Sequence, residues 1–314
     1  MAGGVPFTVL TGFLGAGKTT ALNRVLGDPG GVRIAVLVNE LGRIAIDGKL
    51  ILDAGAGDVL ELAGGCLCCK VDIKNDLWDG IADIIRRSAP DHVILETTGI
   101  AEPPAIIEGL ELYKVRQLVE PAGVICVVDG GVAPKTLGER VEARVQVEHA
   151  DRLLVSKLDI STPEQVAASH RAVGELNPDA ERASFPESAE GTRSLATWML
   201  ERRKLRRPGR TAARPHRHGQ LTAASFVDPA PLAAEPLIAL LTELSGVLMR
   251  AKGFVNIAGD DRRGMLQLAG GRVSLEFGEP WGHEPRRSEF VVIGDGVSDN
   301  ALRRQLWACR AASR

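Results

Sequence analysis

The 314-residue sequence lacks a strong net charge, a long apolar run and a spaced set of cysteines. Its formal net charge of −2 at pH 7 does not fit a chain that is, as a whole, a nucleic-acid-binding or membrane-surface protein. No apolar segment reaches the ~20 residues that cross a bilayer, and no basic stretch precedes an apolar signal segment. We therefore expect a cytoplasmic protein with neither a nucleic-acid partner nor a membrane partner.

The five cysteines are an odd number and are unevenly placed. Three lie in one short CLCC segment, as Cys66, Cys68 and Cys69, whereas Cys126 and Cys309 are far away. A disulfide framework would spread its cysteines through a short secreted domain. In a reducing compartment the cluster is better explained as thiolate ligands for Zn²⁺, Cu(I) or a similar metal. The alternative is that these cysteines are small apolar core residues. Three thiolates would leave one position of a tetrahedral ion open, as a metal carrier needs.

The glycine-rich segment Gly12–Thr19, with the sequence GFLGAGKT, matches the phosphate-binding pattern GxxxxGK[ST]. It follows an apolar run and precedes a helical pattern, which is the context that such a loop requires. Backbone N–H groups and the positive end of the helix would then hold phosphate oxygens. Lys18 would supply charge to the β- and γ-phosphates, and Thr19 a hydroxyl to Mg²⁺. The residues expected at the nucleotide are Gly12, Gly15, Ala16, Gly17, Lys18, Thr19 and Thr20. The alternative is a turn that merely joins strand and helix.

Apolar runs rich in Val, Ile and Leu alternate with helical patterns through the first 200 residues. Such runs are typical of strands buried on both faces of a parallel sheet, and they lie at 6–10, 33–38, 58–62, 92–96, 122–129 and 152–157. The alternation predicts an α/β fold, a three-layer P-loop NTPase domain with a mostly parallel sheet over residues 1–201. The motifs follow strand ends, so they should meet at one edge of the sheet.

Residues 202–219 interrupt the alternation with eight Lys or Arg, two His and no acidic residue. We interpret them as a basic linker; docking of an acidic partner or metal gathering by His216 and His218 are the alternatives. Residues 220–314 are then expected to form a small α+β C-terminal domain. Its expected strands lie at 221–227, 249–258, 266–277 and 289–294, with helices near 231–245 and 298–311. Gly270-Gly271 is typical of a hairpin turn.

Two further motifs follow expected strands. Glu96 ends an apolar run, and Gly99 follows three residues later. The acid can hold the Mg²⁺ shell or the attacking water, and the glycine N–H can sense the γ-phosphate.

Lys157 and Asp159 occupy the positions of an NKxD-type base motif, in which Asp159 accepts hydrogen bonds from guanine and Lys157 lies along the base. The alternative is a strand-to-helix turn capped by aspartate. Asp47 is a candidate near the metal or the phosphates, unless its segment is a plain surface loop.

These segments occur in the order found in the CobW-like family of P-loop GTPases, which the sequence resembles in Gly12–Thr20, Asn39–Asp47, Cys66–Cys69, Glu96–Pro103 and Lys157–Asp159. The resemblance continues in Arg250–Phe254 and in Val292–Gly294 followed by a helix through Cys309. It implies a GTPase with slow intrinsic turnover that acts as a metallochaperone. The implied ligands are GTP or GDP, Mg²⁺ and a transition metal, with Zn²⁺ expected and Co²⁺, Fe²⁺ and Ni²⁺ left open. The implied partner is a client metalloprotein.

The resemblance also implies residue roles. Hydrolysis would depend on Lys18, Glu96 and Gly99, and Mg²⁺ would be held by Thr19 and Glu96. Guanine would be bound by Lys157 and Asp159. The transition metal would be bound by Cys66, Cys68 and Cys69, with Glu40 as a further candidate ligand. The segments 39–57 and 97–103 would act as nucleotide switches.

The sequence departs from the family's pattern at three positions: Ser156 replaces the usual Asn of the base motif, Arg43 a frequent acid and Glu102 a common Asp. Two rival interpretations remain. One is a GTP-dependent regulatory or assembly module whose metal is structural. The other is a small-molecule kinase, which leaves Asp159 and the cysteines without a role.

Overall fold

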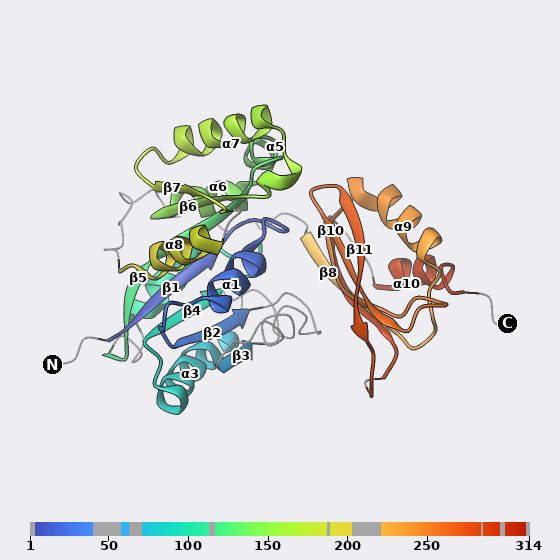
Figure 1. Ribbon diagram of the computed structural model, residues 1–314, viewed down its shortest axis with the longest axis horizontal. Coiled ribbons are helices and arrows are strands. Elements are labelled where there is room, and N and C mark those ends of the chain that lie inside the picture. Colours follow the sequence, from blue (N-terminus) through green and yellow to red (C-terminus); the bar gives the residue numbers. More distant parts are fainter. Residues whose placement is uncertain are drawn as a thin grey trace. The chain divides into compact units, whose positions relative to one another are not determined.

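The computed structural model describes residues 4–39, 58–62, 71–112, 117–186, 189–202, 221–283, 285–295 and 299–311. The chain divides into two compact units. One contains a seven-stranded sheet and the other a five-stranded sheet (Figure 1). Within the described ranges, no helix combines the length and the hydropathy needed to cross a membrane. Residues 203–220, most of the expected linker, lie outside those ranges.

The seven-stranded sheet has the order β3-β2-β4-β1-β5-β6-β7, and all of its strand pairs are parallel. The strands are β1 (Val5–Thr11), β2 (Ile34–Asn39), β3 (Asp58–Leu62), β4 (His92–Glu96), β5 (Val119–Asp129), β6 (Arg152–Ser156) and β7 (Glu181–Ser184). The predicted α/β fold with a parallel sheet is confirmed. Strand β7 was not predicted, because it is a largely exposed edge strand without an apolar run.

Helices cover both faces of this sheet. They are α1 (Lys18–Gly27), α3 (Val71–Ser88), α4 (Pro103–Leu112), α5 (Ala133–Glu139), α6 (Val141–Glu148), α7 (Pro163–Leu176) and α8 (Ala189–Leu200). Helices α1 and α8 pack on one face, against strand residues that include Leu10 and Ile94. Their strand neighbours Val9 and Leu95 point to the opposite face and are also fully buried. Burial on both sides explains the near-continuous apolar runs of the sequence.

The five-stranded sheet has the order β11-β10-β9-β12-β8, and its strand pairs are antiparallel. Its elements are β8 (Leu221–Asp228), α9 (Ala234–Glu243), β9 (Leu248–Val255), β10 (Arg262–Ala269), β11 (Arg272–Pro280), β12 (Ser288–Asp295) and α10 (Asp299–Trp307). The helices and one face of the sheet share a core that includes Phe226, Leu241 and Leu306. Gly270 and Gly271 have positive φ angles of 58° and 75° and form the predicted turn between β10 and β11. The predicted α+β domain is therefore confirmed as a fold.

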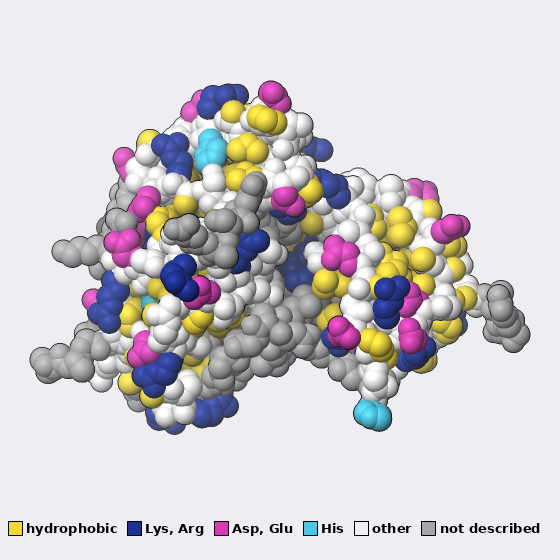
Figure 2. All heavy atoms as spheres, viewed as in Figure 1, with side chains coloured by type: hydrophobic (Ala, Val, Ile, Leu, Met, Phe, Trp, Pro, Cys, Tyr) yellow, Lys and Arg dark blue, Asp and Glu magenta, His cyan; other side chains and the backbone are white. Residues whose placement is uncertain are grey.

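Basic and acidic side chains are interspersed over the face drawn in Figure 2. Some form exposed ion pairs; for example, Nη2 of Arg33 lies 2.8 Å from Oδ1 of Asp91. Hydrogen bonds from Arg33 lower the pKa of the Asp91 carboxyl to about 2. Because water surrounds both side chains, this pair adds little to stability.

Candidate nucleotide site

The phosphate loop between β1 and α1 depends on glycine at three positions. Gly12, Gly15 and Gly17 have φ angles of 141°, 75° and 98°, which other residues rarely adopt. A Cβ atom on Gly12 would also lie only 2.3 Å from the carbonyl oxygen of Val127. Helix α1 begins directly after Gly17, so its N-terminal N–H groups face the loop. This arrangement is a ready site for phosphate.

The structure brings together the two side chains predicted for Mg²⁺. Thr19 lies in the first turn of α1, and its Oγ1 donates a hydrogen bond of 2.7 Å to Oε1 of Glu96 at the end of β4. Both side chains are buried. A hydroxyl and a carboxylate in contact are hard oxygen ligands of the kind that Mg²⁺ prefers, so the pair fits that ion.

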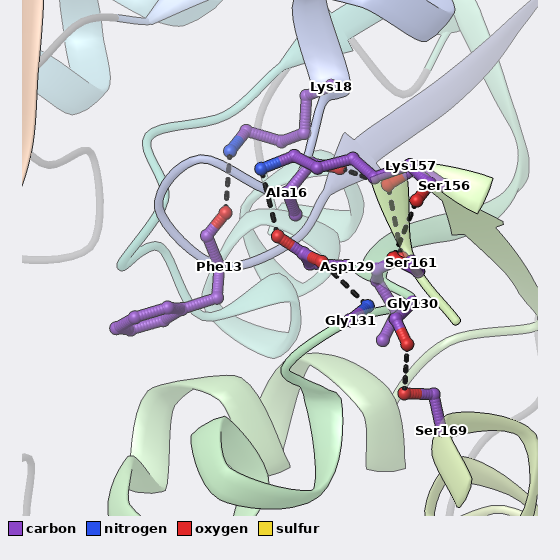
Figure 3. Close-up of polar contacts among 11 residues, drawn as sticks. Phe13, Ala16, Lys18, Asp129, Gly130, Gly131, Ser156, Lys157, Ser161 and Ser169 are labelled. Carbon is purple, nitrogen blue, oxygen red and sulfur yellow. Dashed lines mark hydrogen bonds and ion pairs between the residues drawn. The ribbon is translucent and has the colours of Figure 1, made fainter. Parts of the chain in front are cut away.

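Lys18 lies over its own loop. Its Nζ donates to the carbonyl oxygen of Gly12 at 2.8 Å and lies 3.5 Å from that of Phe13 (Figure 3). The side chain is buried, so water screens its positive charge less than it would at the surface. Lys18, the residue predicted to bind phosphate, thus contacts the carbonyl oxygens of the loop itself.

Gly99 follows β4 in a turn that touches the phosphate loop. A Cβ atom at this position would lie 2.7 Å from the backbone nitrogen of Leu14 and 2.8 Å from its Cα, so the close approach requires glycine. The turn is anchored where Thr97 donates its N–H to the Leu10 carbonyl at 3.0 Å. Gln146 contacts the turn from α6, through Nε2, at the carbonyl oxygens of Gly99 and Ala101. Nothing in the sequence indicated Gln146.

The base motif begins where β6 ends. Lys157 adopts the left-handed conformation, with φ of 59°, which is unusual for a residue with a side chain. Its Nζ forms an ion pair of 2.8 Å with Oδ2 of Asp129, at the end of β5. The other Asp129 oxygen accepts the N–H of Gly131 at 2.9 Å, and Ser161 Oγ donates to the Lys157 carbonyl at 2.6 Å (Figure 3). The conformation of Lys157 is thus fixed by contacts on both sides.

Ser156 connects this motif with the phosphate loop. Its hydroxyl donates to the carbonyl oxygen of Ala16 at 2.5 Å, and the carbonyl oxygen of Val128 lies 3.1 Å away as a second acceptor. Ser156, Lys157 and Ala16 are labelled in Figure 3. The hydroxyl thus joins the motif to the loop although the usual asparagine is absent.

Asp159 lies in a short 3₁₀ helix, Leu158–Ile160, and is exposed. It does not cap the following helix α7, because Thr162 does so in a reciprocal pair with Gln165. The alternative of an aspartate-capped turn is therefore not what the structure has. The exposed carboxylate is accessible to a ligand.

Thr20, which the sequence also predicts at the nucleotide, is exposed in the first turn of α1.

The predicted transition-metal ligands Cys66, Cys68, Cys69 and Glu40, and also Asp47, lie outside the described residues. Among the residues that are described, no group of three or more His, Cys, Asp or Glu side chains could hold a metal ion. Cys126 is fully buried, and burial raises the pKa of its thiol to about 12 although the charge of Lys18 acts in the opposite direction. Cys126 therefore stays a thiol and is unsuited to bind a metal.

Family models match both units of the chain. The model described as CobW/HypB/UreG, nucleotide-binding domain, matches residues 6–183, and that of the cobalamin synthesis protein cobW C-terminal domain matches residues 221–310. The zinc chaperone CobW from a Sinorhizobium species is 29% identical over 95% of each chain. The zinc chaperone YjiA from Escherichia coli is 29% identical over 95% of this chain and 96% of its own. A crystal structure of the zinc-bound YjiA GTPase from E. coli covers 99% of this chain and 100% of its own, at 25% identity and a TM-score of 0.44.

Proposed function

Since this chain belongs to the CobW/HypB/UreG family of P-loop GTPases, we propose that it is a GTP-hydrolysing metallochaperone. It binds a transition metal, zinc in the first place, at Cys66, Cys68 and Cys69, and delivers it to a client metalloprotein in a nucleotide-dependent way. Two relatives that match 95% of the chain are zinc chaperones, which supports this assignment. Three thiolates suit zinc chemically and leave a position open for transfer.

The hydrolytic part of the proposal rests on the hydrogen bond between Thr19 and Glu96. The phosphates of GTP would lie on the N–H groups of the loop, with the Lys18 ammonium turned from its present carbonyl partner to phosphate oxygens. Thr19 and Glu96 would hold Mg²⁺, which supplies charge stabilisation to the transferring phosphoryl group. Glu96 can also orient the attacking water, and the N–H of Gly99 can contact the γ-phosphate. Positioning and charge stabilisation provide most of the catalysis in this reaction class.

Guanine selectivity is assigned to the base motif. The exposed carboxylate of Asp159 would accept hydrogen bonds from the ring N–H and the exocyclic amine of guanine, a pair of donors that adenine does not present. Lys157 would lie along the base, and its ion pair with Asp129 holds the stem of the side chain in one orientation. Ser156 keeps this motif in a fixed position relative to the phosphate loop.

The metal step depends on coupling between two sites. The segments 39–57 and 97–103 would order around the γ-phosphate, and the cysteine segment would change its metal affinity with the nucleotide state. By thermodynamic linkage, bound zinc must alter nucleotide affinity by the same factor. A coupling free energy of ~1–3 kcal/mol, or about 5- to 150-fold in affinity, is sufficient for regulation.

A cysteine-to-serine variant distinguishes this proposal from a regulatory module with a structural metal. The triple variant Cys66→Ser, Cys68→Ser, Cys69→Ser is compared with Cys309→Ser, whose buried thiol lies in the other unit. The readouts are binding of a fluorescent GDP analogue and zinc transfer to a fluorescent chelator. A carrier loses zinc transfer in the triple variant and still binds the nucleotide. Loss of both properties together, with Cys309→Ser unaffected, would instead identify a structural metal.

A further inference from the structure

Gln146 is a buried polar residue on α6 that contacts the turn after β4. Its Nε2 donates to the carbonyl oxygen of Gly99 at 3.1 Å and to that of Ala101 at 3.0 Å. The side chain is fully buried. We infer that Gln146 is a positioning residue for GTP hydrolysis, which holds the Gly99–Ala101 turn against the phosphate loop. This inference rests on the proposed GTPase function, because the turn that Gln146 positions would take part in the hydrolytic step.

The turn has two close neighbours. Gly99 lies so close to Leu14 that even a Cβ atom would overlap the Leu14 backbone. From α6, Nε2 of Gln146 donates to two carbonyl oxygens of the same turn, and a primary amide has two N–H groups for them. The contact with Leu14 limits how far the turn can approach the loop, and the Gln146 hydrogen bonds restrain the turn from α6. A shift of the turn on nucleotide binding would therefore change the hydrogen bonds of Gln146.

These two hydrogen bonds fix the orientation of the turn as well as its position. The Gly99 carbonyl and the N–H of Ile100 belong to one rigid peptide plane that begins at the Cα of Gly99, so fixing this oxygen restrains the backbone directly after the Gly99 N–H. Two bonds from a single planar amide, to residues two positions apart, define the rotation of the turn as well as its distance. A donor that must contact a phosphoryl oxygen needs this orientation before the reaction begins.

Other contacts hold α6 in place independently of Gln146. Asn177, at the end of α7, donates through Nδ2 to the carbonyls of Val147 and Ala150 at 2.7 and 2.9 Å. At the other end, the N–H of Arg140 donates to the Thr136 carbonyl at 2.9 Å. Removal of the Gln146 donors should therefore leave the helix folded. Asn177 also offers a matched control, because it is a buried amide whose Nδ2 donates to the carbonyls at the end of α6.

The test compares Gln146→Met, which keeps most of the side-chain volume and removes both donors, with Asn177→Ala. For Gln146→Met we expect kcat for GTP hydrolysis to fall about tenfold, with the Kd for a fluorescent GDP analogue within about twofold of wild type. For Asn177→Ala we expect a lower melting temperature and a kcat within about twofold of wild type. An equal fall of kcat in both variants, or no fall in Gln146→Met, would overturn the inference.

Hydrogen–deuterium exchange of the 97–103 segment provides a readout that does not require turnover. In the wild type, exchange should be slower with a non-hydrolysable GTP analogue than with GDP, whereas in Gln146→Met it should be fast with both. Exchange in the variant that matches the wild type with both nucleotides would overturn the inference. A wild type without GTP hydrolysis would refute the proposed function instead, and the exchange measurement would still decide the role of Gln146.

Discussion

Oγ1 of Thr19 and Oε1 of Glu96 lie 2.7 Å apart, although 77 residues separate them in the chain. The contact is possible because β1 and β4 are neighbouring parallel strands, paired so that Leu10 lies opposite Glu96. The loop after β1 brings the hydroxyl back over the end of β4. A helix N-terminus and an adjacent strand end thus bring together the two oxygen atoms that would hold the proposed Mg²⁺.

Glu96→Gln should stop hydrolysis while it leaves nucleotide binding in place. The amide retains an acceptor for Thr19 and removes the negative charge that holds Mg²⁺ or orients water. We expect kcat to fall about 100-fold or more, with the Kd for GDP changed only a few-fold. Phosphate release at saturating GTP measures this. Glu120→Gln, an exposed substitution near the start of β5, should keep the wild-type rate, and a similar loss there would contradict the assignment.

Substitution of Ser156 should separate the hydroxyl from the bulk of the side chain. Ser156→Ala removes the hydrogen bond to the Ala16 carbonyl, whereas Ser156→Thr keeps the hydroxyl. We expect the Kd for a fluorescent GDP analogue to rise about fivefold in the alanine variant and to change less in the threonine variant. If alanine binds as tightly as serine, the link between base motif and loop has no role in nucleotide binding.

Asp129→Asn should weaken guanine selectivity. The change removes the charge that pairs with Lys157 and keeps an oxygen for the N–H of Gly131. We expect about tenfold weaker binding of GDP and a smaller ratio of GDP to ADP affinity, both measured by competition with a fluorescent nucleotide. The exposed pair of Asp91 and Arg33 provides the control, since Asp91→Asn should have almost no effect. Unchanged selectivity in Asp129→Asn would contradict the role assigned to the ion pair.

His92 should make the fold sensitive to mild acid. Its ring is buried against the hydroxyl of Thr8, and burial, with a smaller effect of the Arg152 charge, lowers its pKa from 6.5 to about 4. The unfolded chain therefore binds a proton more readily between these values, and stability falls as pH drops through that range. We expect a loss of about 2 kcal/mol between pH 7 and pH 5 from this group. Urea unfolding of His92→Gln should lack that component; an identical pH dependence in both proteins would refute it.

Most strands of the parallel sheet could be predicted because strands that are buried on both faces consist of continuous apolar residues. The runs at 33–38, 92–96 and 152–157 correspond to β2, β4 and β6 within a residue. Strand β7 could not be predicted in this way, since it lies at a sheet edge where water satisfies one side. The turn at Gly270-Gly271 was predictable because positive φ angles are a local property of glycine.

The candidate site was predictable where a motif fixes its own backbone, as the phosphate loop does. Glu96 was predicted because it is an acid at a strand end. Asp129 has the same signal at the end of the 122–129 run and could have been found by the same argument. Gln146 could not, because a polar residue within a helical pattern gives no indication of its partner. Its role depends on packing between α6 and a turn about 45 residues earlier, as the separations of its two bonds show.

The most direct measurement is the zinc affinity of the full chain, determined by competition titration without nucleotide, with GDP and with a non-hydrolysable GTP analogue. We expect the zinc affinity to differ between the nucleotide states by at least about fivefold, as a coupling of ~1 kcal/mol requires. The Cys66→Ser, Cys68→Ser, Cys69→Ser variant should lose both the tight zinc binding and the difference between states. Equal zinc affinity in all three states of the wild type would contradict a nucleotide-driven zinc carrier.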